Sequence, residues 1–246
     1  SMDSYLNGYN DPRLPVYFQP VTEGDNKGEY RGVANGMPNP QQDDYKAMSA
    51  PNVQEKSTDS PLRWMMASEV AFLRAEGAMR GWTAEMGGTA EEFYNKGIEL
   101  SFLENGLSAD AAARYAADET SKPTDFTDVS TANTKYNISA LGKITIKWNA
   151  GASEEEQLER IITQKWIAMF PNGTEAWSEF RRTGYPLIFP VRSNYPTSGV
   201  DTNKQIRRMV FPQSEYSNNG AAVQEAVKLL GGPDNGGTKL WWDKKN

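Results

Sequence analysis

Aromatic side chains that stand beside hydrogen-bonding residues in loop-forming sequence are the first candidates for chemistry in this chain. A sugar ring has apolar C–H faces and a rim of hydroxyl groups, so proteins hold it with flat aromatic surfaces flanked by amides, carboxylates or arginine. Each aromatic side chain could instead pack a loop onto a helix, and the sequence leaves that interpretation open. The candidate ligand-binding residues are Tyr30, Arg31, Asn35, Trp82, Asn133, Tyr136 and Trp148.

Two adjacent arginines, Arg181 and Arg182, could clamp an anion through paired hydrogen bonds. They also fall in the last turn of a predicted helix, where cations complement the terminal carbonyl groups. We expect a structural role, in which they pair with Glu69 or Glu76, because a buried carboxylate needs a cationic partner.

The chain contains no histidine and no cysteine. These absences exclude a Ser-His-Asp triad, a histidine-bound zinc ion, a thiol nucleophile and a disulfide. Carboxylate pairs remain, and a glycoside hydrolase needs two of them at a separation that a sequence does not reveal. No aspartate spacing fits a calcium loop. We therefore expect no catalytic residue, no metal and no cofactor, with a carboxylate glycoside hydrolase kept as an alternative.

The amino-acid composition limits the kinds of molecule that the chain can bind. The formal net charge is −6, which argues against nucleic acid and anionic membrane surfaces, because both attract clustered cations. No apolar run approaches the roughly 18 residues that a membrane-spanning helix needs. Hydrophobic residues make up 38% of the 246 residues, and 21 glycines and 14 prolines indicate much loop.

The sharpest structural signal is a helix–turn–helix at 153–186. Ser153 and Glu156 have the spacing of a capping box, and an apolar face then runs to Phe170. The sequence Pro171-Asn172-Gly173 breaks the helix, Thr174 is the expected cap of a shorter one, and Gly184 fits the position just past its end. Two aromatic residues of this corner, Trp166 and Trp177, are expected to pack.

Two earlier helices are predicted to form a pair. The first runs from Pro61 to about Arg80, with Trp64 and Met65 on its packed face, and the second follows a capping box at Thr89 and Glu92. The pair resembles one tetratricopeptide-like unit, which needs neighbours to cover its exposed faces. The fold class is therefore mainly α, with tetratricopeptide-like helix pairs, long irregular loops and little β structure.

The remaining segments are less regular. Residues 1–60 are predicted to be a loop-rich arm packed on a helical body at 61–246, with one short strand suggested by the alternation of Leu14, Val16 and Phe18. Ser108 is expected to cap a short helix, and 144–148 is either a strand or an extended approach to the next helix. Asn219 is expected to start the last helix. The final pair, Trp241 and Trp242, is expected to pin the terminus.

The amino-acid sequences of several segments resemble those of a known protein family. The segment ITQKWIAMFPNGTEAWSEFRRTGYP resembles the signature region of the SusD/RagB family, the surface glycan-binding lipoproteins of Bacteroidetes. Four further segments agree in the same order, and the resemblance spans nearly the whole chain. They are DPRLPVYFQP (Asp11 to Pro20), PLRWMMASEVAFLRAEGAMRGW (Pro61 to Trp82), RRMVFPQSEYSNN (Arg207 to Asn219) and LWWD (Leu240 to Asp243).

The resemblance implies a function and a location. Family members hold an oligosaccharide or polysaccharide at the cell surface, on the outer membrane, and deliver it to a SusC-like TonB-dependent transporter in nutrient uptake, without catalysis. They are usually about twice as long, so the chain resembles their C-terminal half, and any membrane attachment would come through a lipid anchor outside it. In that case we expect the helix pair at 61–105 to leave an apolar surface uncovered.

Two further alternatives to glycan binding stay open. One is a protein–protein scaffold that contacts no sugar. The other is a relative that binds peptides, as some members of the family are thought to do.

Overall fold

The computed structural model describes residues 1–36, 48–52, 63–129, 136–191 and 198–245. Helices joined by long irregular segments make up this part of the chain, and strand pairing is limited there to isolated bridges at Phe18–Pro51 and Phe126–Ile138. The predicted mainly α fold is thus confirmed. The helices are α1 (Met2–Gly8), α2 (Leu14–Tyr17), α3 (Ala67–Met79), α4 (Thr83–Met86), α5 (Ala90–Glu104), α6 (Ala109–Ala116), α7 (Glu154–Ala168), α8 (Gly173–Thr183) and α9 (Gln213–Leu229).

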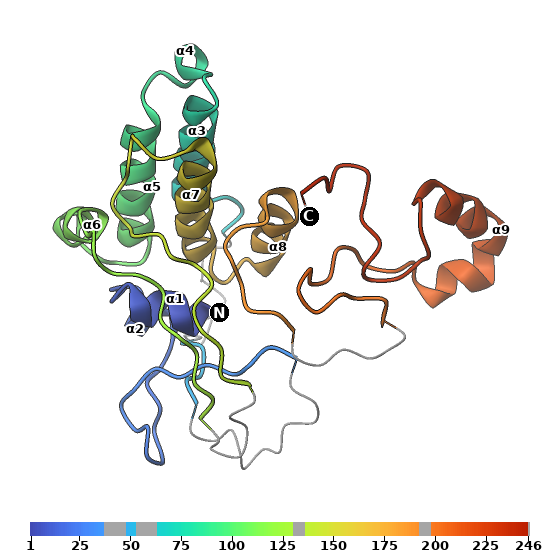
Figure 1. Ribbon diagram of the computed structural model, residues 1–246, viewed down its shortest axis with the longest axis horizontal. Coiled ribbons are helices and arrows are strands. Elements are labelled where there is room, and N and C mark those ends of the chain that lie inside the picture. Colours follow the sequence, from blue (N-terminus) through green and yellow to red (C-terminus); the bar gives the residue numbers. More distant parts are fainter. Residues whose placement is uncertain (37–47, 53–62, 130–135, 192–197, 246) are drawn as a thin grey trace.

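Three long helices, α3, α5 and α7, stand side by side and form the body of the molecule (Figure 1). Helices α3 and α5 are antiparallel, since the hydroxyl of Ser68 at the start of α3 donates to the Glu104 carboxylate at the end of α5, at 2.6 Å. This is the tetratricopeptide-like pair that the sequence predicts. Helix α8 follows α7, α1 and α2 lie at one end of the body, and α9 stands apart from it.

The core lies where α1, α3, α5, α6 and α7 meet. The Tyr94 hydroxyl donates to the carbonyl of Ile146 at 2.5 Å, which fastens the segment 144–148 to α5. That segment forms no strand and bends at Ile146 and Lys147. The fully buried apolar side chains include Tyr5, Leu6, Tyr9, Phe72, Tyr94, Ile98, Phe102, Ile146, Ile161, Ile162 and Ile167.

Local capping signals correctly predict the starts of α5, α6 and α7. The box at Thr89 and Glu92 is complete, with each side chain accepting from the other residue's backbone N–H. Ser108 caps α6, and the Ser153 side chain accepts from the backbone N–H of Glu156 at 3.2 Å. The Glu156 carboxylate does not close a second box, because it pairs with Arg160 at 2.7 Å.

The turn between α7 and α8 differs from the prediction by two residues. The cap of α8 is Asn172, whose side chain accepts from the backbone N–H of Glu175 at 3.2 Å, so Thr174 already lies inside the helix. The end of α8 is as predicted, with Gly184 in the left-handed conformation at φ 80°. Asparagine is preferred to threonine as a cap, so the ranking itself favours Asn172.

The predicted start of α3 is wrong. Pro61 lies outside the described residues, and α3 begins at Ala67 because Met66 is still extended, at φ −91° and ψ 142°. Trp64 and Met65 are therefore not on a helical face, and the Trp64 side chain is 88% exposed instead of packed. In contrast, Trp166 packs edge-on against Tyr5, with ring centroids 5.7 Å apart.

Two predictions for the first residues are also wrong. Helices α1 and α2 form within the stretch predicted to be irregular, and the suggested strand at 14–18 is α2. Pro15 suits a first helical turn, and this outweighs the alternation of apolar residues. The rings of Tyr17 and Phe18 pack against Phe170, with centroids 4.8 and 5.0 Å away.

The predictions for the last helix and for the two terminal tryptophans are confirmed only in part. Helix α9 starts at Gln213, after Pro212, and Asn219 forms a kink within it at φ −142° and ψ 35°. Of the two terminal tryptophans, Trp242 is held by the Arg181 guanidinium, 4.9 Å from its ring, whereas Trp241 is exposed.

One buried cation joins the N-terminal segment to three helices. Arg13 is fully buried, and its guanidinium forms a two-pronged pair with Asp11 at 2.9 and 2.7 Å. It also donates to Ser101 of α5 at 2.9 Å and to Gln164 of α7 at 3.0 Å, while the Tyr115 hydroxyl of α6 donates to Asp11 at 2.8 Å. Burial opposes the charge, but Asp11 more than offsets this and raises the pKa of Arg13.

A second network joins α3, α7 and α8. Arg182 donates to both oxygens of Glu76, at 2.7 and 2.6 Å, which confirms one of the predicted pairs. Burial alone would raise the pKa of Glu76, but hydrogen bonds from Arg182 and Arg80 lower it. The other predicted acceptor, Glu69, pairs instead with the buried Lys165, 3.7 Å away. Arg181 donates to the carbonyl of Arg207 at 3.0 Å.

Three apolar side chains of the α3–α5 pair are exposed, which fits the expectation of an uncovered apolar surface there. Val70 and Leu73 on α3 are 42% and 40% exposed, and Leu103 near the end of α5 is exposed as well. Among the described residues, no helix has the length and apolarity to cross a membrane.

We expect Arg13→Met to lower the free energy of unfolding by about 3–5 kcal/mol, because it leaves the buried Asp11 carboxylate without its partner. The matched control is Lys147→Ala, which removes an exposed pair with Glu119 and should cost far less stability, because water screens exposed pairs. Denaturant titration followed by circular dichroism measures both. Equal losses in the two variants would contradict the role of Arg13.

We expect Glu159→Gln to stabilise the protein at alkaline pH. Burial raises the pKa of Glu159 from 4.5 to about 7, and its Oε1 atom has no hydrogen-bond partner among the described residues. The folded state therefore binds an extra proton between these values, so stability falls as pH rises through 7. The variant should gain about 1 kcal/mol at pH 8, since water screens part of the penalty, and nothing below pH 4. Thermal melts across pH test this against the exposed control Glu85→Gln, which should keep the wild-type pH profile.

We expect the chain to bind a hydrophobic dye or to self-associate through its uncovered α3 face. The double variant Val70→Lys, Leu73→Lys should reduce both signals, measured by dye fluorescence and sedimentation. Leu141→Lys, at a similarly exposed leucine outside this face, is the control. A wild-type chain that is monomeric and binds no dye would count against the expectation.

Candidate functional site

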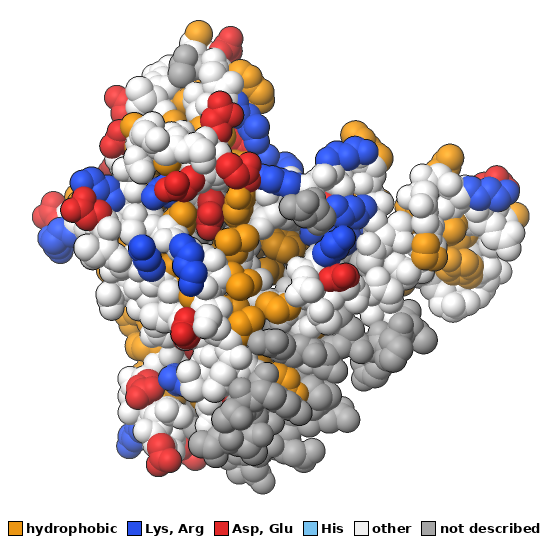
Figure 2. Space-filling model, in the orientation of Figure 1, with side chains coloured by type: hydrophobic (Ala, Val, Ile, Leu, Met, Phe, Trp, Pro, Cys, Tyr) orange, Lys and Arg blue, Asp and Glu red, His pale blue; other side chains and the backbone are white. Residues whose placement is uncertain are grey.

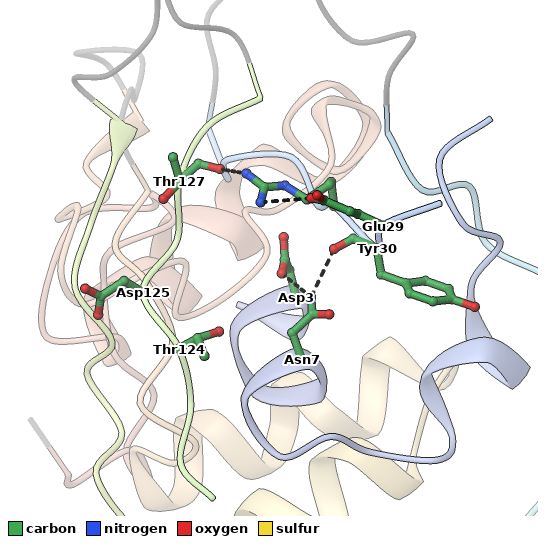
Figure 3. Close-up of a pocket in the computed structure, with 8 residues that line it drawn as sticks. Asp3, Asn7, Glu29, Tyr30, Thr124, Asp125 and Thr127 are labelled. Atoms are coloured by element: carbon green, nitrogen blue, oxygen red, sulfur yellow. Dashed lines mark hydrogen bonds and ion pairs between the residues drawn. The ribbon is translucent and has the colours of Figure 1, made fainter. Parts of the chain in front are cut away.

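A cavity of about 440 Å³, here called the polar hollow, opens where α1, residues 29–31 and residues 124–127 meet. Its lining combines carboxylates, an amide, hydroxyl groups and one guanidinium. The lining residues are Asp3, Asn7, Glu29, Tyr30, Arg31, Thr124, Asp125 and Thr127, and they are drawn in Figure 3.

Helix α1 supplies one side of the polar hollow. Asp3 and Asn7 are four residues apart and so lie on the same helical face, where the Asn7 amide donates to Asp3 at 2.6 Å. The amide also donates to the carbonyl of Tyr30 at 3.0 Å, and the second Asp3 oxygen accepts from the backbone N–H of Gly32 at 2.7 Å. These bonds fix the orientation of both side chains.

Arg31 bridges the other two segments. Its guanidinium donates to the carbonyl of Thr127 at 2.8 Å and lies 3.6 Å from the Glu29 carboxylate. Its backbone is held by Ser49, which accepts from the Arg31 N–H at 3.0 Å. The Nε atom has no hydrogen-bond partner among the described residues. Arg31 therefore ties the arm to 124–127 while one of its donors stays unsatisfied.

Hydrogen bonds hold the wall at 124–127 in place. The backbone N–H of Thr124 donates to the carbonyl of Ser4 in α1 at 2.9 Å. Asp125 accepts from the backbone N–H of Ala140 at 2.8 Å, next to the bridge between Phe126 and Ile138. Gly8 makes the approach possible, since a Cβ there would lie 2.2 Å from a backbone oxygen at residue 122.

The charges of the polar hollow favour an uncharged, hydroxyl-rich ligand. Asp3, Glu29 and Asp125 supply three carboxylates against the single guanidinium of Arg31, so the lining repels anions. Carboxylates accept and guanidinium groups donate, which matches the hydroxyl rim of a sugar. Within the described residues, no group of three or more acidic side chains could hold a metal ion.

The structure brings two of the predicted ligand-binding residues together. Tyr30 and Arg31 both line the polar hollow, although Tyr30 contributes its carbonyl there and its ring points away (Figure 3). Asn35 is exposed a few residues further along the arm. Asn133 lies outside the described residues.

The other three candidates lie elsewhere. Trp148 is only 8% exposed and packs on Tyr94, with ring centroids 5.2 Å apart. Tyr136 is buried, and Trp82 is exposed just before α4, at the opposite end of the body from α1. In this structure the rings of Trp148 and Tyr136 have no free face for a ligand.

The sequence did not single out Asp3 or Asp125, whereas Asn7 is one of several hydrogen-bonding residues beside the tyrosines of the arm. The spacing of Asp3 carries a signal only once α1 is known to be a helix, because its four-residue separation from Asn7 then places both on one face. Asp125 sits in a polar stretch in which many residues look alike.

Comparisons with known proteins agree with this fold. A family model of SusD-like proteins, described as Susd and RagB outer membrane lipoprotein, matches residues 1–243. A chitin-binding SusD homolog from Flavobacterium johnsoniae is 43% identical, with a TM-score of 0.90 over 100% of this chain and 49% of that one. A SusD-like protein from Bacteroides thetaiotaomicron is 44% identical, with a TM-score of 0.90 over 100% and 50%. A SusD homolog from Bacteroides uniformis is also 44% identical, with a TM-score of 0.88 over 99% and 49%.

The chain thus spans about half the length of these solved relatives. A comparison with curated protein sequences finds no significant match.

The residues that carry the sequence resemblance also hold the fold together. Arg13 anchors the N-terminal segment, Arg182 joins α8 to α3, and Arg207 pairs with Asp243 near the C-terminus. The family model spans nearly the whole chain, and structures at more than 40% identity superpose on all of it. The chain therefore belongs to the SusD-like family of outer membrane lipoproteins.

Proposed function

We propose that this chain binds an oligosaccharide at the surface of the outer membrane and passes it to a SusC-like TonB-dependent transporter, without catalysis. The observation that carries the proposal is the match over the whole chain to a chitin-binding SusD homolog at 43% identity. The outer-membrane location follows the description of the family. We further propose that the protein is exposed at the cell surface and that it passes the glycan to the transporter.

The polar hollow is the proposed contact site for the glycan. It offers donors and acceptors that are already oriented, so binding would lose little side-chain entropy. Its excess of carboxylates suits a neutral sugar, whose hydroxyl groups both donate and accept. Arg31 is the residue that we expect to contribute most, because hydrogen bonds from a charged donor are stronger than neutral ones.

We further propose that the arm at 1–60 and the body at 61–246 work as one unit in binding. The contacts of Arg13 with Ser101 and Gln164 support this, since they join the arm to two helices of the body. Tyr30 and Arg31 on the arm would then face the wall at 124–127 in a fixed geometry.

A scaffold that docks a protein without touching sugar is the second candidate. The uncovered apolar face at Val70, Leu73 and Leu103 favours it, because exposed apolar patches mark docking surfaces. The peptide-binding and glycoside hydrolase alternatives have no comparable observation in their favour.

Affinity gel electrophoresis and calorimetry with chito-oligosaccharides and other neutral glycans test the proposal. We expect Arg31→Lys, which keeps the charge but loses the planar guanidinium with its several donors, to weaken glycan binding. For any glycan that the wild type binds, the loss should be about tenfold, the equivalent of roughly 1.4 kcal/mol. Arg114→Ala, at an exposed arginine on α6, should bind like the wild type.

Two outcomes would overturn the proposal. Binding to a transporter without retardation on any glycan would favour the scaffold. New reducing ends after incubation with a polysaccharide would favour the hydrolase.

A further inference from the structure

A second hollow, of about 480 Å³, lies near the C-terminus and is not used by the proposed function. We call it the C-terminal hollow. It is formed by the end of α9 and the last turn of the chain. Its lining residues are Leu229, Leu230, Gly231, Gly232, Thr238, Lys239, Leu240, Trp241, Asp243 and Lys244.

Trp241 is presented to solvent at the C-terminal hollow. Its side chain is 82% exposed, whereas its neighbour Trp242 is partly buried beneath the Arg181 guanidinium. A tryptophan kept in water forfeits a large apolar contribution to folding. Together with a hollow beside it, such a ring provides a flat surface for a ligand.

The backbone that carries Trp241 is held rigidly. Arg207 donates to both oxygens of the buried Asp243, at 2.7 and 2.5 Å, and also to the carbonyl of Arg181 in α8 at 3.0 Å. The Asp243 N–H closes the turn by donating to the carbonyl of Leu240 at 2.9 Å. The exposure of Trp241 is therefore built into the fold, because the residues on both sides of it are fastened.

Small residues and leucines share the lining of the C-terminal hollow with Trp241 and the lysines. Gly232 lies close to Thr238, since a Cβ on the glycine would be 3.2 Å from the threonine side chain. The Thr238 hydroxyl donates to the carbonyl of Pro233 at 2.6 Å. An indole and apolar side chains beside a hydroxyl group suit a sugar ring, which has an apolar C–H face and a rim of hydroxyl groups.

The charge of the C-terminal hollow is opposite to that of the polar hollow. Its only carboxylate, Asp243, is committed to Arg207, and Lys239 lies 3.9 Å from it. Lys244 is exposed and forms no ion pair with any described residue. Figure 2 shows Lys and Arg side chains gathered over this end of the chain, beside α8. The C-terminal hollow therefore attracts anions.

We propose that the C-terminal hollow binds an acidic saccharide unit, with the sugar ring on Trp241 and its carboxylate held by Lys239 and Lys244. The indole face matches the C–H face of a pyranose, and the lysines match a negative charge that the polar hollow would repel. The site differs from the polar hollow in position, charge and residues.

The test uses oligogalacturonate and its methyl ester, which share a backbone and differ in charge. We expect the acid form to retard the wild-type chain in affinity electrophoresis and the ester to bind at least tenfold more weakly. Trp241→Ala should weaken binding of the acid form about tenfold or more. The double variant Lys239→Gln, Lys244→Gln should do the same and should remove most of the salt dependence.

Trp64→Ala is the matched control, because Trp64 is equally exposed but lines neither hollow. It should bind oligogalacturonate like the wild type. Trp241 has little packing to lose, so circular dichroism should show a folded Trp241→Ala variant.

Three results would overturn the proposal. They are unchanged binding by Trp241→Ala, equal binding of the ester, and binding that is lost in Arg31→Lys but kept in Trp241→Ala. Failure of the chain to bind any neutral glycan would refute the proposed function at the polar hollow and leave this result standing.

Discussion

The guanidinium of Arg13 lies entirely out of water, and the rest of the fold has to satisfy it. Asp11 supplies the countercharge, and Ser101, Tyr115 and Gln164 take up the remaining donors. A buried charge is tolerated only when its partners are in place, so three helices must meet at this point. Helix α1 directly precedes this cluster, and its position sets one side of the polar hollow.

A second buried cation lies at another junction of helices. Lys165 lies among Glu69, Glu175 and Glu179, at 3.7, 3.0 and 3.5 Å, where α3, α7 and α8 come together. Burial raises the pKa of Glu69, although Lys165 opposes this shift. Such networks add little net stability over apolar packing, but an incomplete one is costly. They therefore restrict how the helices fit together, in a chain with no disulfide.

The sequence alone predicts interactions between neighbouring residues, such as helix caps, but not contacts between distant parts of the chain. The caps at Thr89, Ser108 and Ser153 depend on residues three positions away, so the sequence alone predicts them. The contacts of Arg13 join positions about 90 and 150 residues apart, and no spacing rule relates them. Trp148 and Trp64 show the same limit: both were assigned by local pattern, and tertiary packing buried one and exposed the other.

The two hollows share one design despite their opposite charges. In each, an arginine holds nearby backbone in place: Arg31 fixes residues 29–31 against 127, and Arg207 fixes the turn that carries Trp241. A ligand then meets groups that need not be ordered on binding, which preserves affinity that loops would otherwise lose to conformational entropy. Because the charges differ, neutral and acidic sugar units would bind at different places on the molecule. A glycan that contains both kinds of unit could engage both hollows at once, and its avidity would then depend on the spacing of its acidic residues.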